Sequence, residues 1–257
     1  MSDSPIAPDT QPETIHLSRP WGHMEQYALN THASVKIVTV NAGAELSLQY
    51  HHQRAELWVM LDDGLVVELD GKSWEAKAGE EIWIPVGMTH RLRAPNNGGR
   101  LLEVAFGHFD EADIVRLSDR YGRGAWPATT RAMPDPDGPP FAQPALIQDE
   151  GAWGHAVQYA RNTPVSVKLV KVRAGGVHSL QVHRLRSELW VILDAGLRVE
   201  VDGRMWHPNP GDEVWIPAGS THRVAAPDHG GRFIEISFGY FSEADVTRLE
   251  DAYGRVS

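Results

Sequence analysis

Residues 46–61 read LSLQYHHQRAELWVML, and residues 178–193 read HSLQVHRLRSELWVIL. The correspondence between the two stretches continues without a gap in both directions, from residues 20 and 152 to residues 123 and 255, and 60 of these 104 positions are identical to their partners. A repeat of this length is a whole domain, because the units of solenoid proteins are only about 20 to 50 residues long. The sequence therefore predicts two copies of one small domain.

The rest of the chain divides by composition. Residues 1–18 are polar and contain prolines, which predicts a flexible tail, and residues 124–150 contain six prolines, which is typical of a linker. The predicted domains are residues 19–123 and residues 151–257, each close to the ordinary domain size of about 100 residues. Nine tryptophans and 42% apolar residues are enough for a core in each domain.

Short apolar or alternating runs fill each copy. In the first copy they cover residues 34–40, 46–51, 56–61, 65–69, 81–84, 89–93 and 101–106. Such runs between Gly and Pro turns predict an all-β sandwich or barrel, and Asp-Gly at residues 70–71 and 202–203 predicts type I′ hairpins. An acidic start and a terminal glycine predict one closing helix in each copy, over residues 111–121 and 243–253.

Composition also limits the class of function. The chain has no cysteine, which excludes disulfides, zinc–thiolate sites and thiol catalysis. A net charge of −10 argues against a nucleic-acid partner. We see no signal peptide and no apolar run near the ~20 residues that a membrane helix needs. We therefore expect a cytoplasmic protein with no membrane partner, and its strands and tryptophans make a homodimer a further expectation.

Four polar residues in each copy have the chemistry of metal ligands. Strand alternation places Gln49 and His51 on one face, Glu56 returns to the same cavity, and a Pro–Gly turn delivers His90. Two imidazoles, one carboxylate and one amide oxygen suit a divalent Zn, Mn, Fe, Co or Ni ion. The second copy repeats the set as Gln181, His183, Glu188 and His222. We expect one ion in each domain.

The alternative is that these are ordinary polar residues on strands. A single histidine on a strand is more often a structural residue than a ligand. The duplication of all four residues in register favours the metal site, and only the complete set supports it.

Other polar residues are candidates for the surroundings of the metal. Lys36 and Lys168 share the inward face of their strands with valines. Each lysine either binds an anionic group of the substrate or transfers a proton, because a buried ammonium needs a partner. The alternative is that its aliphatic stem packs on the sheet while its ammonium reaches water. Arg54 and Arg186 follow the histidine turn, either at the mouth of the cavity, where a guanidinium suits phosphate or carboxylate, or in a solvated loop.

Glu103 and Glu235 lie on an otherwise apolar last strand. Each is a candidate base, a partner that orients a histidine, or a residue with a purely structural hydrogen bond, and the last two readings are favoured. The tryptophans near these residues are expected in the core and not as platforms for a sugar. The candidates for the catalytic base are His52, Lys36 and Glu103, and the candidates for substrate binding are Arg54, Lys168 and Arg186.

Two motifs carry a resemblance to a known family. GX5QYHX4E over residues 43–56 and GX5PVGX2H over residues 79–90 resemble the two motifs of the cupin superfamily. Together with RPWG at 19–22, RAE at 54–56, HRL at 90–92 and YGR at 121–123, they look like the C-terminal cupin domain of type II mannose-6-phosphate isomerases. The resemblance implies two tandem jelly-roll barrels and a metal-dependent aldose–ketose isomerase.

This sequence departs from the family pattern at several positions. The family's domain usually follows a pyrophosphorylase domain, whereas here the cupin is doubled. The usual run of three histidines is HHQ at residues 51–53 and HRL at residues 183–185, and the histidine expected after the metal glutamate is Leu57 or Leu189. The ligand positions are kept, but the rim of the pocket has changed.

Three functional hypotheses follow. The first is isomerisation of a sugar or sugar phosphate, in which the metal binds the carbonyl and hydroxyl oxygens and a base moves a proton between C1 and C2. The second is a dioxygenase or decarboxylase that acts on a small molecule, because two histidines and one carboxylate form the ligand set of non-haem iron oxygenases. The third is a non-catalytic module that binds a sugar.

Overall fold

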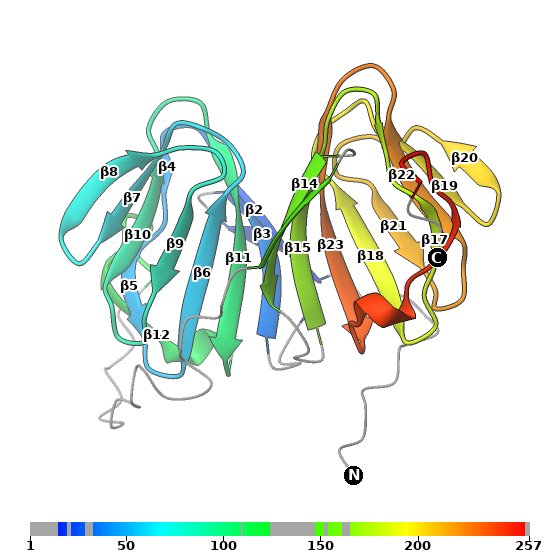
Figure 1. The fold of residues 1–257 in the computed structure, drawn as a ribbon. Helices are drawn as coiled ribbons and strands as arrows, with labels where there is room; N and C mark the ends of the chain where they lie inside the picture. Colours follow the sequence, from blue (N-terminus) through cyan, green and yellow to red (C-terminus); the bar gives the residue numbers. More distant parts are fainter. Residues whose placement is uncertain are drawn as a thin grey trace, which may run out of the picture. The chain divides into compact units, whose positions relative to one another are not determined.

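The computed structural model describes residues 15–19, 22–28, 33–108, 110–123, 147–151, 154–160 and 165–254. These residues fall into two compact units, which we call the first domain (described residues up to 123) and the second domain (described residues from 147). Each domain consists of two antiparallel β-sheets that face each other (Figure 1). The predicted two-domain, all-β architecture is therefore confirmed.

Each sheet of the first domain draws its strands from distant parts of the sequence. One sheet has the order β1 (Ile15–Arg19), β2 (Gly22–Ala28), β3 (Ala33–Val40), β11 (Gly99–Gly107), β6 (Arg54–Met60) and β9 (Glu81–Ile84). The other has the order β12 (Ile114–Ser118), β5 (Leu48–His51), β10 (His90–Ala94), β7 (Leu65–Leu69) and β8 (Lys72–Ala76), and the short β4 (Ala44–Glu45) also pairs with β10.

The second domain repeats this topology strand by strand. Its first sheet has the order β13 (Ile147–Gly151), β14 (Gly154–Ala160), β15 (Val165–Val172), β23 (Gly231–Gly239), β18 (Arg186–Ile192) and β21 (Glu213–Ile216). Its second sheet has the order β20 (Arg204–Trp206), β19 (Arg198–Val201), β22 (His222–Ala226), β17 (Leu180–Val182) and β24 (Thr247–Glu250), with β16 (Gly176–Val177) paired to β22.

The core of the first domain lies between its two sheets. Val38, Trp58 and Leu101 enter it from one sheet, and Val67 and Leu92 enter it from the other, each at most 2% exposed. Strand alternation explains the selection, because every second residue of a strand points to the same face. The second domain has a matching cluster around its buried tryptophan, Trp190. Burial of a tryptophan in each cluster removes a large apolar area from water.

The predicted hairpins are also confirmed. Asp70 and Gly71 both have positive φ angles, 46° and 77°, and they connect β7 to β8 as a two-residue loop. Asp202 and Gly203 do the same between β19 and β20, with φ angles of 48° and 78°. Positive φ at both central residues defines the type I′ turn, whose twist matches that of the flanking strands.

The predicted closing helices are wrong. Only a single 3₁₀ turn, η1 (Glu111–Asp113), forms in the first domain, and the chain continues as β12, which pairs with β5. The second domain has η2 (Glu243–Asp245) followed by β24, which pairs with β17. Ile114 and Val115 are β-branched and buried, and the free edge of β5 supplies backbone partners; this pairing outweighs the local helix signals.

Two strands lie in segments to which the sequence analysis gave no structure. β1 falls mostly in the predicted tail, and β13 falls at the end of the predicted linker; each pairs with the strand that follows it. The rest of the tail and the linker lie outside the described residues. Among the described residues, no helix is long and apolar enough to cross a membrane.

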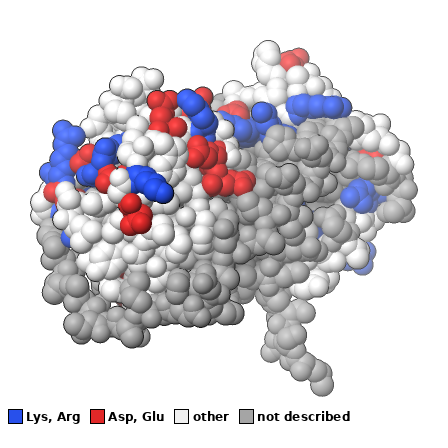
Figure 2. All heavy atoms as spheres, turned by 60° about the vertical axis from the view of Figure 1, so that its left-hand side comes forward, with Lys and Arg blue, Asp and Glu red and all other residues white. Residues whose placement is uncertain are grey.

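Charged side chains on neighbouring strands of the first domain form ion pairs. Arg91 and Arg93 on β10 both contact Glu68 on the neighbouring β7, and Arg91 also reaches Glu45 on β4. Figure 2 shows basic and acidic side chains interspersed on the face that this view presents. Pairs of opposite sign on adjacent strands therefore offset part of the surface charge.

Candidate metal centre

Three strands of the first domain bring the predicted ligands together. Gln49 and His51 lie on β5, Glu56 lies on β6, and His90 begins β10, whose backbone pairs with β5 at Gln49. The turn before β10 is tied to the same place, because Gly87 donates its backbone N–H to the carbonyl of His51 at 2.8 Å. A local turn and a sheet pairing thus fix where His90 enters.

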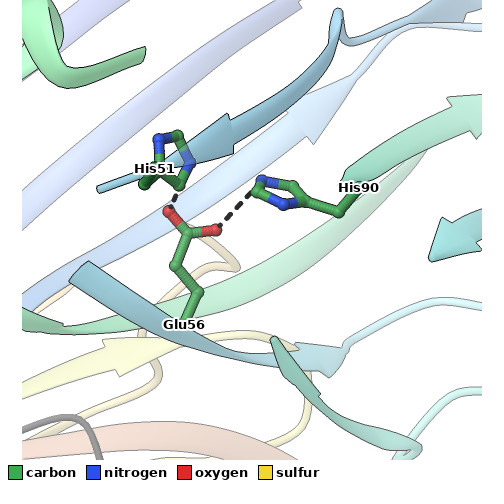
Figure 3. A group of neighbouring side chains, drawn as sticks. All are labelled: His51, Glu56 and His90. Atoms are coloured by element: carbon green, nitrogen blue, oxygen red, sulfur yellow. Dashed lines mark ion pairs between the residues drawn. The ribbon is translucent and has the colours of Figure 1, made fainter. Parts of the chain in front are cut away.

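The ligand atoms of the first domain converge in a buried cluster (Figure 3). Glu56 Oε1 lies 3.1 Å from His51 Nε2, and Glu56 Oε2 lies 3.6 Å from His90 Nε2. One ligand atom from each of the three residues lies within 4.8 Å of the others. All three side chains are at most 2% exposed. Such convergence of imidazole and carboxylate groups in the interior is the arrangement that a bound cation requires.

One histidine of each site is held in a metal-ready orientation by a backbone carbonyl. His90 Nδ1 lies 2.9 Å from the carbonyl oxygen of Met88, so a proton on Nδ1 is donated there and the lone pair remains on Nε2, the nitrogen that faces Glu56. His222 makes the same contact with the carbonyl of Ser220 at 3.1 Å. A hydrogen bond of this kind fixes both the tautomer and the ring orientation of a metal-ligating histidine.

The amide groups of the predicted ligands Gln49 and Gln181 make other hydrogen bonds. Gln49 Oε1 accepts a hydrogen bond from Ser47 Oγ at 2.7 Å, and Ser179 contacts Gln181 Oε1 in the same way at 3.2 Å. In the second domain the amide nitrogen of Gln181 is the atom that faces His222 Nε2, at 3.4 Å. Ligation through the amide oxygen therefore requires the amide group to turn over, which exchanges its oxygen and nitrogen within nearly the same outline.

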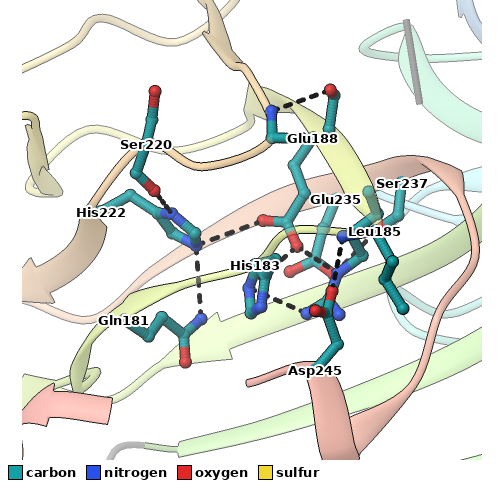
Figure 4. A network of polar contacts seen from close by, with 12 residues as sticks. Gln181, His183, Leu185, Glu188, Ser220, His222, Glu235, Ser237 and Asp245 are labelled. Atoms are coloured by element: carbon teal, nitrogen blue, oxygen red, sulfur yellow. Dashed lines mark hydrogen bonds and ion pairs between the residues drawn. The ribbon is translucent and has the colours of Figure 1, made fainter. Parts of the chain in front are cut away.

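The second domain repeats the arrangement of the first (Figure 4). Glu188 Oε1 lies 3.4 Å from His183 Nε2, and Glu188 Oε2 lies 3.6 Å from His222 Nε2. The centroids of the two imidazole rings are 4.9 Å apart, as are those of His51 and His90. Among the described residues, these two clusters are the groups of three or more His, Asp or Glu side chains that could hold a metal.

The electrostatics of the cluster favour neutral imidazole and ionised carboxylate. Burial, and then the positive charge of Arg54, lowers the pKa of His51 to about 3. Burial alone would raise the pKa of Glu56, but His51, Arg54 and His90 together hold it well below its usual value. Because His51 is neutral at pH 7, Arg54 supplies the cationic partner of Glu56 at that pH.

The second domain has the same electrostatic pattern. Burial, and then the charge of Arg186, lowers the pKa of His183 to about 2. Burial also opposes ionisation of Glu188, but Arg186, His222 and Lys168 lower its pKa. Neutral histidine and ionised carboxylate are the forms that bind metal ions. The chemistry of both donor sets therefore fits a divalent transition metal.

Arg54 does not lie where the sequence analysis expected it. Instead of the mouth of the cavity, it occupies the interior at 2% exposure, where its Nε donates to Glu56 Oε1 at 2.9 Å. Arg186 is 3% exposed and donates to Glu188 Oε1 at 2.8 Å. The reason is strand alternation: Arg54 and Glu56 are two residues apart on β6 and share its inward face.

A tryptophan completes the support of each carboxylate, and the sequence analysis missed this role. Trp58 Nε1 donates to Glu56 Oε2 at 3.0 Å, and Trp190 Nε1 donates to Glu188 Oε2 at 3.0 Å. A signal was present in the sequence, because Trp58 follows Glu56 by two residues and so shares its face. In each domain, one oxygen of the buried carboxylate thus accepts a hydrogen bond from the arginine and the other accepts one from the tryptophan.

Lys36 and Glu103, two candidates for the catalytic base, form a buried ion pair. Lys36 Nζ lies 2.7 Å from Glu103 Oε1, and the residues are 3% and 7% exposed. Glu103 pairs across the sheet with both Lys36 and Trp58, so the pair stands next to the tryptophan that supports Glu56. Lys168 and Glu235 form the equivalent pair at 3.0 Å.

The third candidate, His52, has a different environment. Its ring makes an edge contact with Tyr50, with centroids 5.2 Å apart. Tyr50 alternates with Gln49 and His51 along β5, which directs it away from the face that carries the ligands. The backbone N–H of His52 donates to Asp113 at 3.2 Å, which anchors the turn. The His52 ring thus contacts a residue on the opposite face of β5 from the predicted ligands, whereas the Lys36–Glu103 pair stands beside Trp58.

Comparison with known proteins identifies the family. A sequence profile described as Mannose-6-phosphate isomerase C-terminal matches residues 9–119 and again residues 149–251, which together make up most of the chain. The chain belongs to this family. The family's domain is thus present twice, as the internal repeat indicates.

Known relatives match over one domain. Alginate biosynthesis protein AlgA of Pseudomonas aeruginosa is 39% identical over 112 residues, which are 43% of this chain and 23% of that protein. Mannose-1-phosphate guanylyltransferase of Escherichia coli K12 is 41% identical over 107 residues, which are 41% of this chain and 22% of that protein. The matched segment thus covers less than a quarter of the length of these relatives.

Solved structures show that the fold is a tandem cupin. Oxalate decarboxylase from Bacillus subtilis matches with a TM-score of 0.53 and 18% identity, covering 97% of this chain and 79% of that one. A second oxalate decarboxylase structure, which concerns the substrate binding mode of that enzyme, matches with a TM-score of 0.52 and 19% identity, covering 97% and 80%. The likeness establishes the architecture, and the predicted tandem cupin fold is confirmed.

Proposed function

We propose that this chain is a metal-dependent aldose–ketose isomerase that acts on a sugar or a sugar phosphate, with mannose 6-phosphate as the first substrate to test. Membership of the mannose-6-phosphate isomerase C-terminal family supports the reaction class. The observation that carries the proposal is the buried His51–Glu56–His90 cluster with a second ion pair, Lys36–Glu103, on the adjacent strands. Such a site offers both a place for a cation and groups that can exchange protons.

The cation would be held by the two imidazoles and the carboxylate of each cluster, with Gln49 or Gln181 as a further ligand. When bound, a divalent metal supplies Lewis-acid polarisation of the carbonyl and hydroxyl oxygens of a sugar. Trp58 and Arg54 keep the carboxylate of Glu56 in place through one hydrogen bond to each oxygen. The carboxylate of Glu56 is therefore held in one orientation before a cation binds.

Lys36 and Glu103 carry the proton transfers in this proposal. Glu103 accepts the proton from C2 of the aldose and delivers it to C1. The Lys36 ammonium gives a proton to O1 and, as the amine, accepts the proton of O2, so both residues return to their starting state. General acid–base catalysis of this kind contributes about 10²- to 10⁴-fold in rate. We assign these roles in the first domain, whose sequence is nearer to the family pattern.

An NMR screen tests the proposal directly. The purified protein, loaded with Zn²⁺, Mn²⁺ or Co²⁺ in turn, is mixed with mannose, fructose and their 6-phosphates. The expected result is interconversion of one aldose–ketose pair, which stops on addition of a chelator and returns with the metal. No interconversion with any metal and substrate would contradict the isomerase assignment.

A second candidate function rests on the ligand set itself. Two histidines and one carboxylate also support oxygen-dependent chemistry on small acids when the metal is iron or manganese. The fold likeness to oxalate decarboxylase makes oxalate a reasonable first substrate for this alternative. Oxygen uptake, or release of carbon dioxide from oxalate, by the iron- or manganese-loaded protein would favour it over isomerisation.

A further inference from the structure

The arginine next to each carboxylate also contacts a metal-ligand histidine. Arg54 Nη2 lies 3.1 Å from His51 Nε2, while its Nε binds Glu56 Oε1 and its Nη1 donates to the backbone carbonyl of Asp110 at 3.3 Å. Each of the three guanidinium nitrogens therefore has a hydrogen-bond partner inside the first domain. It bridges two of the residues that would hold the cation.

The second domain makes the same three contacts. Arg186 Nη2 lies 2.8 Å from His183 Nε2, its Nε donates to Glu188, and its Nη1 donates to the carbonyl of Ser242 at 3.3 Å. The third partner is a backbone oxygen in both domains, so the change from Asp110 to Ser242 leaves the contact intact. Figure 4 shows the carboxylate and the imidazole of this group facing each other.

The contact with histidine has a chemical consequence. An imidazole nitrogen has one lone pair, and it accepts either a hydrogen bond from a guanidinium or a bond to a metal ion. His51 Nε2 is the nitrogen that faces Glu56, so it is the one needed for a metal shared with that carboxylate. A carboxylate oxygen has a second lone pair, so the Arg54–Glu56 contact can persist when a cation binds.

We propose that Arg54 and Arg186 are built-in competitors of the metal. Each guanidinium neutralises the buried carboxylate and occupies the lone pair of the neighbouring histidine. Loading of the metal then breaks the arginine–histidine hydrogen bond and keeps the arginine–glutamate bond. This inference rests on the metal site of the proposed function and concerns how that site is loaded, whatever reaction it performs.

Two effects follow from a cation fixed at this place. The positive charge repels a divalent ion in a medium of low effective dielectric constant, so it weakens binding. The same charge supplies the buried carboxylate with a partner, so folding of the domain does not depend on the metal. The rival view is that the arginine only orients Glu56; in that case its removal weakens metal binding, because the carboxylate loses its support.

The sign of the change in zinc affinity separates these views. Arg54→Met and Arg186→Met remove the guanidinium with its charge and keep an unbranched apolar stem, and the affinity for Zn²⁺ is measured by competition with a chromophoric chelator. We expect one site per chain to bind zinc at least tenfold more tightly in each variant, while the other site is unchanged. Unchanged or weaker binding at the altered site would overturn the proposal.

Arg100→Met is the matched control. Arg100 forms an ion pair with Asp62 at 2.8 Å in the first domain, but its side chain is 29% exposed. Removal of this charge is expected to leave zinc affinity unchanged. Equal tightening in Arg100→Met and Arg54→Met would show a general effect of net charge and would overturn the specific role of Arg54.

A measurement on the unaltered protein does not depend on the folding of a variant. In ¹⁵N NMR spectra, a guanidinium fixed at Nη2 shows hindered rotation about its Cζ–Nη bond. Titration with Zn²⁺ is expected to speed this rotation for Arg54 and Arg186 and to preserve their Nε–H signals. Zinc binding with no change at Nη2 would overturn the proposal. Zinc affinity and arginine NMR signals do not depend on isomerase activity. A failure of the isomerase proposal would therefore be detected in the substrate screen and not in these experiments.

Discussion

The two domains share the frame of the metal centre and differ in what surrounds it. In both, one arginine and one tryptophan hold the carboxylate; the arginine contact is 2.9 Å in the first domain and 2.8 Å in the second, and the tryptophan contact is 3.0 Å in each. In the first domain, the Lys36 side chain is 4% exposed and contacts Glu103 at 2.7 Å. In the second, the Lys168 side chain is 17% exposed and contacts Glu235 at 3.0 Å.

The rim of the second domain has changed as well. His52 and Gln53 are replaced by Arg184 and Leu185, both exposed, and the side chain of Leu185 is 50% exposed. Ser237, which stands where the first domain has an alanine, contacts Glu235. The arginine and tryptophan that hold each carboxylate lie on the same strand as that carboxylate, so alternation along one strand determines this support. The lysine–glutamate pairs depend instead on the pairing of neighbouring strands. We infer that the first domain performs the reaction and that the second binds metal without the same activity.

The largest expected effect comes from the carboxylates. Glu56→Gln and Glu188→Gln should each lower the zinc content from about two ions per chain to about one, because a neutral amide replaces the charged ligand. Glu56→Gln should also lower kcat/KM for isomerisation by about a thousandfold or more, whereas Glu188→Gln should leave most of the activity. Equal loss of activity in both variants would contradict the assignment of catalysis to the first domain.

The lysines should give the next largest difference. Lys36→Met removes the proton donor of the proposed reaction, so kcat should fall by about 10²- to 10⁴-fold while zinc content stays unchanged. Lys168→Met should lower kcat by less than about threefold. Steady-state kinetics with metal analysis of the same samples provide the check, and a larger effect of Lys168→Met would reverse the roles of the domains.

The free energy of unfolding should decrease in acid, and His51 and His183 should contribute equally to the decrease. The pKa of His51 is lowered to about 3 and that of His183 to about 2, so between these values and about 6.5 the unfolded chain binds protons that the folded chain does not. The free energy of unfolding should therefore decrease as the pH falls from 7 to 5, by about 2 kcal/mol for each histidine.

Urea denaturation of chelator-treated protein at several pH values measures this dependence. His51→Gln and His183→Gln should each remove about half of the pH-dependent loss. A stability that does not change between pH 7 and pH 5 would mean that the histidines are not held neutral in the folded protein.

The hydrogen bonds donated by the two indole groups should contribute equally to the stability of their domains. Trp58→Phe and Trp190→Phe keep an aromatic ring but leave one oxygen of the buried carboxylate without its donor. Each should destabilise the protein by about 1.5 kcal/mol, a typical contribution for a hydrogen bond to a charged group. Thermal or urea unfolding measures the effect, and a clear inequality between the variants would show that the two frames are not equivalent.

The smallest effect is expected at the rim. Leu185→Gln and Gln53→Leu exchange the residues of the two domains at a position that lies outside the ligand cluster. Because such surface changes usually alter stability by less than about 0.5 kcal/mol, neither should shift the unfolding midpoint or the zinc content measurably. A loss of zinc from either variant would show that the rim takes part in the site.

The sequence predicted the repeated parts of this molecule well, because they follow local rules. Alternation along a strand placed Gln49 and His51 together, and the Asp70–Gly71 pair predicted the hairpin that the structure contains. The closing helices failed, since the segment after η1 pairs with β5, a strand far away in the sequence that no local pattern reveals as its partner. The position of Arg54 was missed because the predicted strand begins at Glu56, whereas β6 begins at Arg54, so Arg54 shares the inward face of Glu56.

The central claim is that each domain gathers two imidazoles and one carboxylate around a divalent ion. The most direct test is a crystal grown with zinc and measured at the zinc absorption edge. The predicted result is an anomalous peak in both clusters, one bonded to His51, Glu56 and His90 and the other bonded to the equivalent residues of the second domain. Crystals in which both clusters hold no zinc, with the arginines still bound to the histidines, would contradict the claim.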